Sequence, residues 1–382
     1  MATSTRLPPA RAEHIGSFLR PAELRAELDR VYAPKHTALL AEERAKDLSR
    51  LHAIEDKCIK EVIKKQREVG LSVLTDGEFR RNLWHIDFLK SFANVSVARS
   101  AVKVSFHTET GDIERLPSAL RVDGKLARTR PIFVEHYRFL QSVAHATPKI
   151  TIPSPSVLHF RGGRHSIDAT AYPELEDFYA DLARVYAEEV RDLGTAGCRY
   201  LQIDEVNLAY LCDPKLRAEV RNIGEDPATL PRTYARLING AIATRPRDLT
   251  VCMHLCRGNF ESAWLAEGGY EPVAETLFNE VDVHGYLLEY DTPRAGDFAP
   301  LRFVPKGKRV VLGLVTSKRG ALESKDDLKR RIDEASRVLP LEQLALSPQC
   351  GFASGERGNK LTVEEQWAKL RLIVEVAREV WG

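Results

Sequence analysis

The strongest constraint on the fold is an alternation along the chain, in which short apolar runs of strand length are separated by longer segments with helical periodicity. In Tyr172–Leu193, apolar residues recur at steps of three and four, as on one face of a helix. Lys325–Val338 and Thr362–Val380 show the same period, and Thr362 followed by Glu365 predicts a capping box. We predict eight strands: Glu13–Phe18, Leu71–Thr75, Lys149–Pro153, Tyr200–Asp204, Thr250–Leu255, Val281–Leu288, Arg309–Val315 and Gln343–Leu346.

Eight strands alternating with helices over 382 residues are typical of an α/β chain folded as a (β/α)8 TIM barrel. The alternative is an open, doubly wound sheet, but no Gly-x-Gly-x-x-Gly follows the first strand. Arg25–Val69 predicts an extended helical segment after strand 1. Asn94–Lys125 alternates in the manner of strands and predicts a β-hairpin excursion after strand 2, with turn residues at Gly111–Asp112. Because no internal repeat or low-complexity linker is present, we treat residues 1–382 as a single domain.

Charge and composition exclude several classes of protein. Lysine plus arginine number 56 and aspartate plus glutamate 54, so a net charge of +2 argues against a broad basic face for nucleic acid. No apolar run reaches the length of about 18 residues that a membrane span needs, and Met1–Pro9 lacks the apolar stretch of a secretory signal. Six cysteines in 382 residues are too few for a disulfide scaffold. We therefore expect a cytoplasmic monomer or homodimer with no membrane or nucleic-acid partner.

Metal-binding residue types follow several of the predicted strands, where TIM barrels carry their chemistry. His254 and Cys256 are two apart on one strand and therefore point to the same face. Cys350 ends strand 8 and Glu289 ends strand 6, and the four together suit the tetrahedral preference of zinc for nitrogen and sulfur ligands. Glu280 remains open as an alternative carboxylate. A core histidine beside a small buried thiol is the structural alternative for the pair on strand 5.

The remaining cysteines are predicted to be structural: Cys252 lies deeper in the barrel, and Cys58, Cys198 and Cys212 lie elsewhere. Two thiolates and one carboxylate would already cancel the charge of a zinc ion, so such a site is a poor generator of hydroxide. Holding an incoming thiol as its thiolate suits this donor set better, with the glutamate loosening as the thiol arrives. The residues thus favour alkyl transfer to sulfur.

Five motifs occur along the chain in this order: Ile15-Gly16-Ser17, Asp76-Gly77-Glu78-Phe79, Gln202-Ile203-Asp204-Glu205, His254-Leu255-Cys256 and Pro348-Gln349-Cys350-Gly351. Together they resemble the catalytic C-terminal barrel of cobalamin-independent methionine synthase, and still more its short, single-barrel bacterial relatives. The resemblance covers about residues 9–380, and in the short relatives it extends to His14 before the first motif, to Pro153–Gly163 and to Ser347–Phe352.

This resemblance implies a site for zinc and a site for an amino-acid thiol. The implied zinc ligands are His254, Cys256, Glu289 and Cys350. The implied substrate-binding residues are Ile15, Gly16, Ser17, Glu78 and Asp204: the backbone amides of the glycine and serine would take the α-carboxylate, and the two acids the α-ammonium. A helix cap or a surface pair is the structural alternative for the two acids.

Four departures from the family's pattern concern the methyl donor. The full-length enzyme has a second barrel that 382 residues do not accommodate, and Tyr210 stands where the family has a folate-contacting glutamate. The expected tryptophan is absent from Pro153–Gly163, and the expected histidine is replaced within Thr316–Lys318. The His159–Arg164 loop, rich in arginine and glycine, either binds a different, anionic donor or is a solvated loop.

The resemblance implies a zinc-dependent S-methyltransferase that methylates homocysteine to methionine, with the donor open between a methylated folate, a methylcorrinoid and another methylated compound. Two alternatives stay open. One is a zinc-dependent alkyltransferase that joins another small thiol to an epoxide or a similar electrophile, and the other is a non-catalytic metal-binding barrel.

Overall fold

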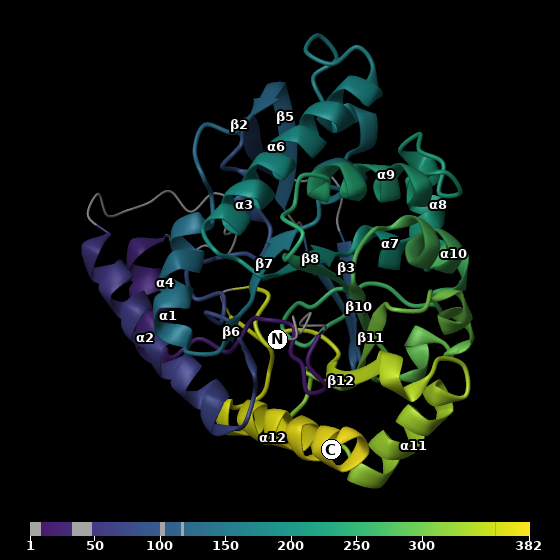
Figure 1. The fold of residues 1–382 in the computed structure, drawn as a ribbon. Helices are drawn as coiled ribbons and strands as arrows, with labels where there is room; N and C mark the ends of the chain where they lie inside the picture. The colour runs from purple at the N-terminus through teal and green to yellow at the C-terminus, as the bar shows by residue number, and fades with distance from the viewer. Residues whose placement is uncertain (1–8, 33–47, 100–103, 116–117, 356) are drawn as a thin grey trace.

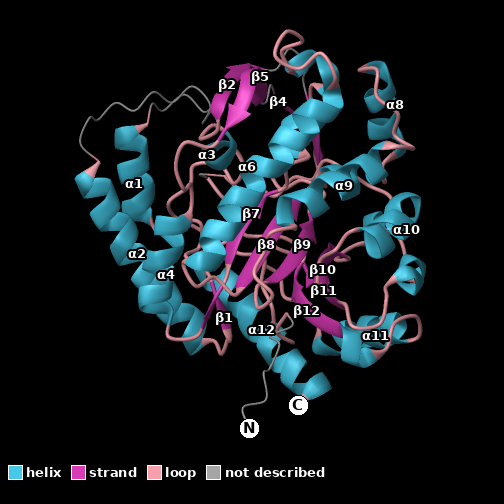
Figure 2. Cartoon of the chain, turned by 45° about the horizontal axis from the view of Figure 1, so that its top comes forward, coloured by secondary structure: helices cyan, strands magenta, loops and turns pink. Residues whose placement is uncertain are grey.

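The protein is described by a computed structural model for residues 9–32, 48–99, 104–115, 118–355 and 357–382 (Figure 1). It is an α/β TIM barrel whose strands lie inside a ring of helices, as Figure 2 shows. Six parallel strands form one sheet, and each pairs with its neighbour in the sequence. They are β7 (Ile150–Pro153), β8 (Tyr200–Glu205), β9 (Thr250–Leu255), β10 (Gly285–Glu289), β11 (Arg309–Val315) and β12 (Leu344–Pro348).

The barrel closes through its first two segments. β1 (Val73–Leu74) pairs in parallel with β6 (Thr147–Pro148), which leads directly into β7. On the other side, Ala12 forms a parallel bridge with Leu346 of β12, and the N–H of Glu13 donates to the Leu346 carbonyl over 2.9 Å. The N-terminal segment therefore lies between β12 and β1, as barrel closure requires.

The predicted strand Glu13–Phe18 is wrong, because the bridge at Ala12 lies just before this segment and the segment itself forms no ladder. At Gly16 the backbone takes a φ of +136°, which breaks an extended strand. Carbonyl oxygens of the segment instead accept hydrogen bonds from the buried side chains of Lys149, Gln202 and Thr75. Side chains therefore replace the missing ladder and fix an irregular backbone at the mouth of the barrel.

The other seven predicted strands are confirmed, some with shifted bounds. β9 and β11 match their predictions, whereas β10 starts at Gly285 because Val281–Val283 forms a turn.

Helices surround the barrel strands. They are α1 (Ala22–Val31), α2 (Ser49–Glu68), α3 (Ile86–Leu89), α4 (Val134–Ala144), α5 (Val157–Phe160), α6 (Leu175–Thr195), α7 (Asn207–Tyr210), α8 (Pro214–Asn222), α9 (Leu230–Ile242), α10 (Glu271–Glu280), α11 (Lys325–Ser336) and α12 (Val363–Trp381). Short 3-10 turns also occur: η1 (Gly163–Ser166), η2 (Pro293–Ala295), η3 (Ala299–Phe303) and η4 (Leu341–Gln343).

The three predicted amphipathic helices are α6, α11 and α12. One face of α6 buries Phe178, Leu182 and Val185 against the barrel, as its period predicts. The predicted capping box opens α12: the Glu365 N–H donates to Thr362 over 3.1 Å, and the Glu365 carboxylate accepts from the Thr362 N–H over 2.7 Å. In the predicted extended helical segment, α1 and α2 are confirmed, and residues 33–47 lie outside the described part of the chain.

The excursion after strand 2 consists of two antiparallel pairs, one nested inside the other in sequence. β2 (Ala93–Arg99) pairs with β5 (Ser118–Ala127), and β3 (Val104–Thr108) pairs with β4 (Gly111–Arg115). The turn of the inner hairpin falls at residues 109–110, two positions before the predicted turn, because Gly111 already pairs with Thr108. In Figure 2, β2 and β5 project beyond the barrel strands.

A buried polar layer fills the amino-terminal part of the barrel. Lys149 is fully buried, and its Nζ donates to Glu13 and to Gln202, each over 3.0 Å. The hydroxyl of Tyr200 donates to the other Glu13 oxygen over 3.0 Å. Because the buried charges are paired and hydrogen-bonded, this layer seals one end of the barrel and leaves the opposite end for chemistry. Among the described residues, no helix is both long and apolar enough to span a bilayer.

Candidate metal centre and substrate pocket

Four potential metal ligands converge at the carboxyl end of the barrel. His254 is the second-last residue of β9 and Cys256 directly follows that strand, Glu289 is the last residue of β10, and Cys350 lies two residues after β12. All four are buried, and one donor atom from each lies within 4.8 Å of the others. The parallel register places Leu287 of β10 beside His254, so the two strand ends arrive at the same level. The four residues of the predicted zinc site are therefore brought together.

The imidazole of His254 is oriented by the neighbouring strand β10. Its Nδ1 lies 3.1 Å from the carbonyl oxygen of Leu287, the contact of a ring N–H donor. Its Nε2 is buried, and within the described residues it has no hydrogen-bond partner. Metal-binding histidines commonly have this arrangement, in which one nitrogen is fixed by a carbonyl and the other offers its lone pair.

The two thiols form a close pair. The Sγ atoms of Cys256 and Cys350 lie 3.5 Å apart, and both residues are free cysteines. A hydrogen bond from the Cys256 thiol, together with the nearby imidazole, holds the pKa of Cys350 well below its usual range. The same hydrogen bond and burial raise the pKa of Cys256. The pairing therefore favours the thiolate form of Cys350, which is the form of cysteine that binds metals.

Burial alone would lower the pKa of His254, but Cys350, Asp204 and Glu289 outweigh it and raise that pKa to about 9. The acidic groups around the ring therefore favour a positive charge at this position. An imidazole, two thiols and a carboxylate within one buried cluster match the ligand types of zinc. The donor set therefore fits a zinc ion by its chemistry.

Glu289 is held on both sides of its carboxylate. Oε1 accepts the backbone N–H of Arg257 over 2.8 Å, and Oε2 lies 3.5 Å from the side-chain amide of Gln349. Glu280, the alternative carboxylate, is not part of the cluster. It ends α10, and its Oε1 accepts from Arg232 over 3.1 Å at the exposed surface.

The remaining cysteines lie outside the cluster. Cys252 packs inside the barrel with Tyr200 and Leu287, as its deeper position predicts. Cys58, Cys198 and Cys212 are buried, and the last two donate weakly to backbone carbonyls. None of the four has a ligand atom in the metal cluster of the described residues.

The two acids of the predicted amino-acid pocket are buried at the same end of the barrel. Glu78 lies on the turn after β1 with a φ of +61°, and its Oε1 accepts a hydrogen bond from Thr151 over 3.3 Å. Its Oε2 lies 3.6 Å from a guanidinium nitrogen of Arg81. Asp204 lies on β8 in register with His254, and its Oδ1 accepts from Gln202 over 2.7 Å. Neither acid is a helix cap or an exposed pair.

Burial raises the pKa of Glu78 to about 7. The negative charges of Asp204 and Asp76 act in the same direction, and together these effects outweigh the attraction of Arg81. Burial also raises the pKa of Asp204, against the attraction of His254. Two carboxyls that are difficult to ionise together form a site that gains from a cation placed between them. An ammonium group has the required charge and hydrogen-bond donors.

The segment Ile15–Ser17 lies beside Glu78 at Gly16 and beside the residues that follow Cys350 at Ser17. A Cβ atom on Gly16 would lie 3.2 Å from the nearer Glu78 oxygen, so a side chain would crowd that acid. The hydroxyl and carbonyl of Ser17 accept from Ala353 and Phe352, just after Cys350. Among the hydrogen bonds of the described residues, none uses the N–H of Gly16 or Ser17. Ile15 packs its side chain into the barrel interior, and its carbonyl oxygen accepts from Gln202 over 2.6 Å.

Residues in the regions that depart from the family's pattern contact other side chains of the protein. Tyr210 is buried on α7, with its ring 6.0 Å from that of Phe160. His159, from the arginine- and glycine-rich loop, is fully buried and hydrogen-bonds to Tyr234 over 2.9 Å and Tyr179 over 3.1 Å. The histidine of that loop therefore supports the fold.

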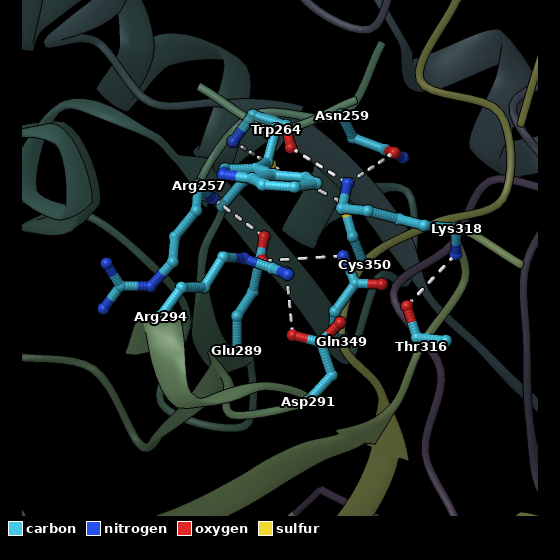
Figure 3. A network of polar contacts seen from close by, with 12 residues as sticks. Arg257, Asn259, Trp264, Glu289, Asp291, Arg294, Thr316, Lys318, Gln349 and Cys350 are labelled. Carbon is cyan, nitrogen blue, oxygen red and sulfur yellow. Dashed lines mark hydrogen bonds and ion pairs between the residues drawn. The ribbon is translucent and has the colours of Figure 1, made fainter. Parts of the chain in front are cut away.

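Three residues near the cluster were not among the predicted site residues. Lys318 donates to the Asn259 side chain over 3.1 Å and to two backbone carbonyls of the loop after β9. Arg294 and Gln349 both approach Glu289, as Figure 3 shows. Gln349 precedes Cys350 directly, and this adjacency was the available signal. Arg294 lies on a 3-10 turn after β10, where no periodic pattern marks it.

A TIM barrel with two cysteines, one histidine and one glutamate at its carboxyl-terminal mouth defines a class of candidate metalloenzymes. Residues 12–379 match the family described as "Cobalamin-independent synthase, Catalytic domain". The chain belongs to this family.

Individual relatives agree with this assignment. The chain is 44% identical to the uncharacterized protein YxjH of Bacillus subtilis, over 98% of this chain and 96% of that protein. A solved structure of a putative vitamin-B12-independent methionine synthase from Listeria monocytogenes shares 36% identity with a TM-score of 0.75, covering 98% of this chain and 99% of the other. A 5-methyltetrahydropteroyltriglutamate–homocysteine methyltransferase of Thermotoga petrophila is 24% identical over 84% of this chain, but only 39% of that longer protein is matched.

Proposed function

We propose that this protein is a zinc-dependent S-methyltransferase that methylates homocysteine to methionine. The observation that carries the proposal is the buried cluster of His254, Cys256, Glu289 and Cys350, in which Nε2 of the histidine has no partner among the described residues. When bound there, zinc would hold an incoming thiol as its thiolate at neutral pH. The name of the Thermotoga petrophila relative supports homocysteine as the acceptor.

The chain's own residues would orient the amino acid. Glu78 and Asp204 would bind its ammonium group, since each lone carboxyl is disfavoured as an anion in this buried pocket. The N–H groups of Gly16 and Ser17 would bind its carboxylate, because neither has another acceptor among the described residues. Asp204 is the register partner of His254, so an amino acid bound there would direct its side chain toward the metal cluster.

The transfer itself needs an aligned donor. The sulfur attacks the methyl carbon, the new S–C bond forms, and the bond to the leaving group breaks as that group takes the electron pair. We keep three donor classes: a methylated folate, a methylcorrinoid and another methylated compound. Tyr210 offers no carboxylate to the polar edge of a pterin, so we predict that methyltetrahydrofolate is a poor donor by about three decades in affinity.

A product assay tests the proposal. Purified protein would be incubated with homocysteine and, separately, with mono- and triglutamyl methyltetrahydrofolate, methylcobalamin and simpler methylated compounds, and methionine would be measured by mass spectrometry. Zinc-dependent methionine from one donor is the expected result. Turnover with triglutamyl methyltetrahydrofolate at the rate of the two-barrel enzymes would contradict the prediction about the donor. Bound zinc without product from any donor would favour a non-catalytic metal-binding barrel.

A second candidate is an alkyltransferase that joins another small thiol to an epoxide. Arg81 lies 3.6 Å from Glu78 and is buried, so a cation already stands beside the pocket and would suit an anionic thiol. The same assay separates the two functions if a panel of thiols and a simple epoxide are added. Product from an anionic thiol and epoxide, without methionine from homocysteine, would support this candidate over the first.

A further inference from the structure

Arg294 is placed between two buried carboxylates next to the metal cluster (Figure 3). Its Nη2 lies 2.7 Å from Oδ1 of Asp291 and 3.6 Å from Oε2 of Glu289. The side chain of Arg294 is 9% exposed, and those of the two acids are at most 1% exposed. At these distances the guanidinium makes a close hydrogen-bonded ion pair with Asp291 and a looser ion pair with Glu289.

The position of the guanidinium is fixed from above. Arg294 lies under the indole ring of Trp264, with 5.2 Å between the guanidinium carbon and the ring centroid. Trp264 is itself held by two backbone hydrogen bonds with His107 of the excursion hairpin, at 2.7 and 3.0 Å. A cation over an aromatic face is stabilised electrostatically and cannot tilt freely. The hairpin therefore holds Trp264, and Trp264 in turn holds Arg294 beside Glu289.

The neighbouring cations are directed elsewhere. The guanidinium of Arg257 lies over the ring of Tyr270 at 4.3 Å, and in Figure 3 it points away from Glu289 and Cys350. The Nζ of Lys318 donates to three oxygens of the loop after β9. Among the residues that the structure describes, Arg294 is thus the cation whose side chain pairs with Glu289.

We propose that Arg294 is a positioning residue that, shared between Asp291 and Glu289, keeps Glu289 the weakest of the four metal ligands. This inference rests on the proposed function for the presence of zinc. The positive charge beside Oε2 withdraws negative charge from the carboxylate and repels a divalent cation. Asp291 limits this effect, because it holds the guanidinium at the closer distance. Glu289 is then the ligand most readily exchanged for a substrate thiol.

Removing the charge of Arg294 and removing the charge of Asp291 should have opposite effects on zinc affinity. In Arg294→Met the cation disappears, so we expect the zinc dissociation constant to fall about tenfold or more. In Asp291→Asn the guanidinium is free to pair fully with Glu289, so we expect that constant to rise about tenfold. A merely structural role for Arg294 predicts weaker zinc in both variants, since disorder around Glu289 never strengthens its bond.

The experiment is a competition titration of zinc against a chromogenic chelator, with the full-length protein. Arg294→Lys keeps the charge, so its zinc dissociation constant should stay within about threefold of that of the wild type. The double variant Arg294→Met/Asp291→Asn removes both charges, and its zinc dissociation constant should lie between those of the two single variants. It replaces Arg294→Met in the comparison if that protein does not fold. Arg302→Met is the matched control, because Arg302 is a half-exposed arginine paired with Glu271 on the surface; it should leave zinc affinity unchanged.

Two failures can be told apart. A wild-type protein that binds no zinc contradicts the proposed function. A wild-type protein that binds zinc, together with an Arg294→Met variant of equal or weaker affinity, contradicts only the role of Arg294. In the double variant, zinc affinity below that of Asp291→Asn would also contradict it.

Discussion

The two halves of the candidate site are built from different kinds of backbone. The metal half lies on the ends of β9, β10 and β12, where the register of parallel strands places the four donor side chains at one level. The amino-acid half lies largely on irregular backbone, with a φ of +136° at Gly16 and +61° at Glu78. Regular strands are sufficient to gather metal ligands, whereas exposing backbone N–H groups requires leaving the sheet.

The two halves also differ in how they are kept in place. His254 of the metal half is fixed by a main-chain carbonyl of the adjacent strand. In the amino-acid half, Thr75, Lys149 and Gln202 reach across the barrel to carbonyls of the irregular segment. Loss of a metal ligand should therefore act locally, whereas changes around Gly16 should disturb a shared network.

The largest effect is expected in the metal half. Cys256→Ser and Cys350→Ser should each weaken zinc binding by more than about a hundredfold, since each removes a thiolate ligand. Metal content by plasma mass spectrometry and a chelator competition would measure this. Cys58→Ala is the matched control, because that thiol is buried on α2 far from the cluster in sequence and outside it in space. Full zinc in either serine variant would show that its cysteine is not a ligand.

The next effect separates the two halves directly. Asp204→Asn and Glu78→Gln should weaken binding of homocysteine by about 10- to 150-fold, the equivalent of about 1.5–3 kcal/mol for a charged hydrogen bond. Zinc content should stay at one ion per chain in both. Isothermal titration of the zinc-loaded protein with homocysteine would measure the affinity. If both variants bind homocysteine as the wild type does, the ammonium pocket is elsewhere and the alkyltransferase candidate gains support.

A smaller effect should follow from crowding the irregular segment. Gly16→Ala places a Cβ 3.0 Å from Thr151 and 3.2 Å from Glu78, at a φ that L-residues rarely adopt. We expect a loss of about 1–3 kcal/mol in unfolding free energy and weaker homocysteine binding. Gly307→Ala also has a positive φ but meets nothing within 4 Å, so it controls for backbone strain alone. Equal homocysteine affinity in the two variants would contradict the close approach to Glu78.

The smallest effect is a pH dependence that arises in the amino-acid half. Glu78 has a pKa of about 7, so it gains a proton as pH falls through that value and the ammonium loses one charged partner. Beyond the pH dependence of thiol deprotonation, homocysteine affinity should drop about fourfold from pH 8 to 6.5, and Glu78→Gln should remove this additional part of the profile. Titrations across that range, with zinc content checked at each pH, would measure it. A profile in the variant as steep as in the wild type would assign the titration to another group.

The same contrast explains how much the sequence predicted. The barrel, the seven strands and the cluster of His254, Cys256, Glu289 and Cys350 follow from periodicity and from residues at strand ends. The first segment was predicted as a strand because its apolar pattern does not reveal that buried side chains bind its carbonyls. Arg294 was missed because its role depends on a 3-10 turn and on Trp264 from another loop. Long-range contacts of this kind leave no periodic signal in a single sequence.

The central claim is that four residues at the mouth of the barrel hold one zinc ion ready for a thiol. X-ray absorption spectroscopy at the zinc edge, on protein purified without added chelator, tests it most directly. The account predicts one zinc per chain with two sulfur neighbours at about 2.3 Å and two nitrogen or oxygen neighbours at about 2.0–2.2 Å. Added homocysteine should raise the sulfur count to three as a nitrogen or oxygen neighbour is lost. A zinc shell without sulfur, or a sulfur count that homocysteine leaves unchanged, would contradict the account.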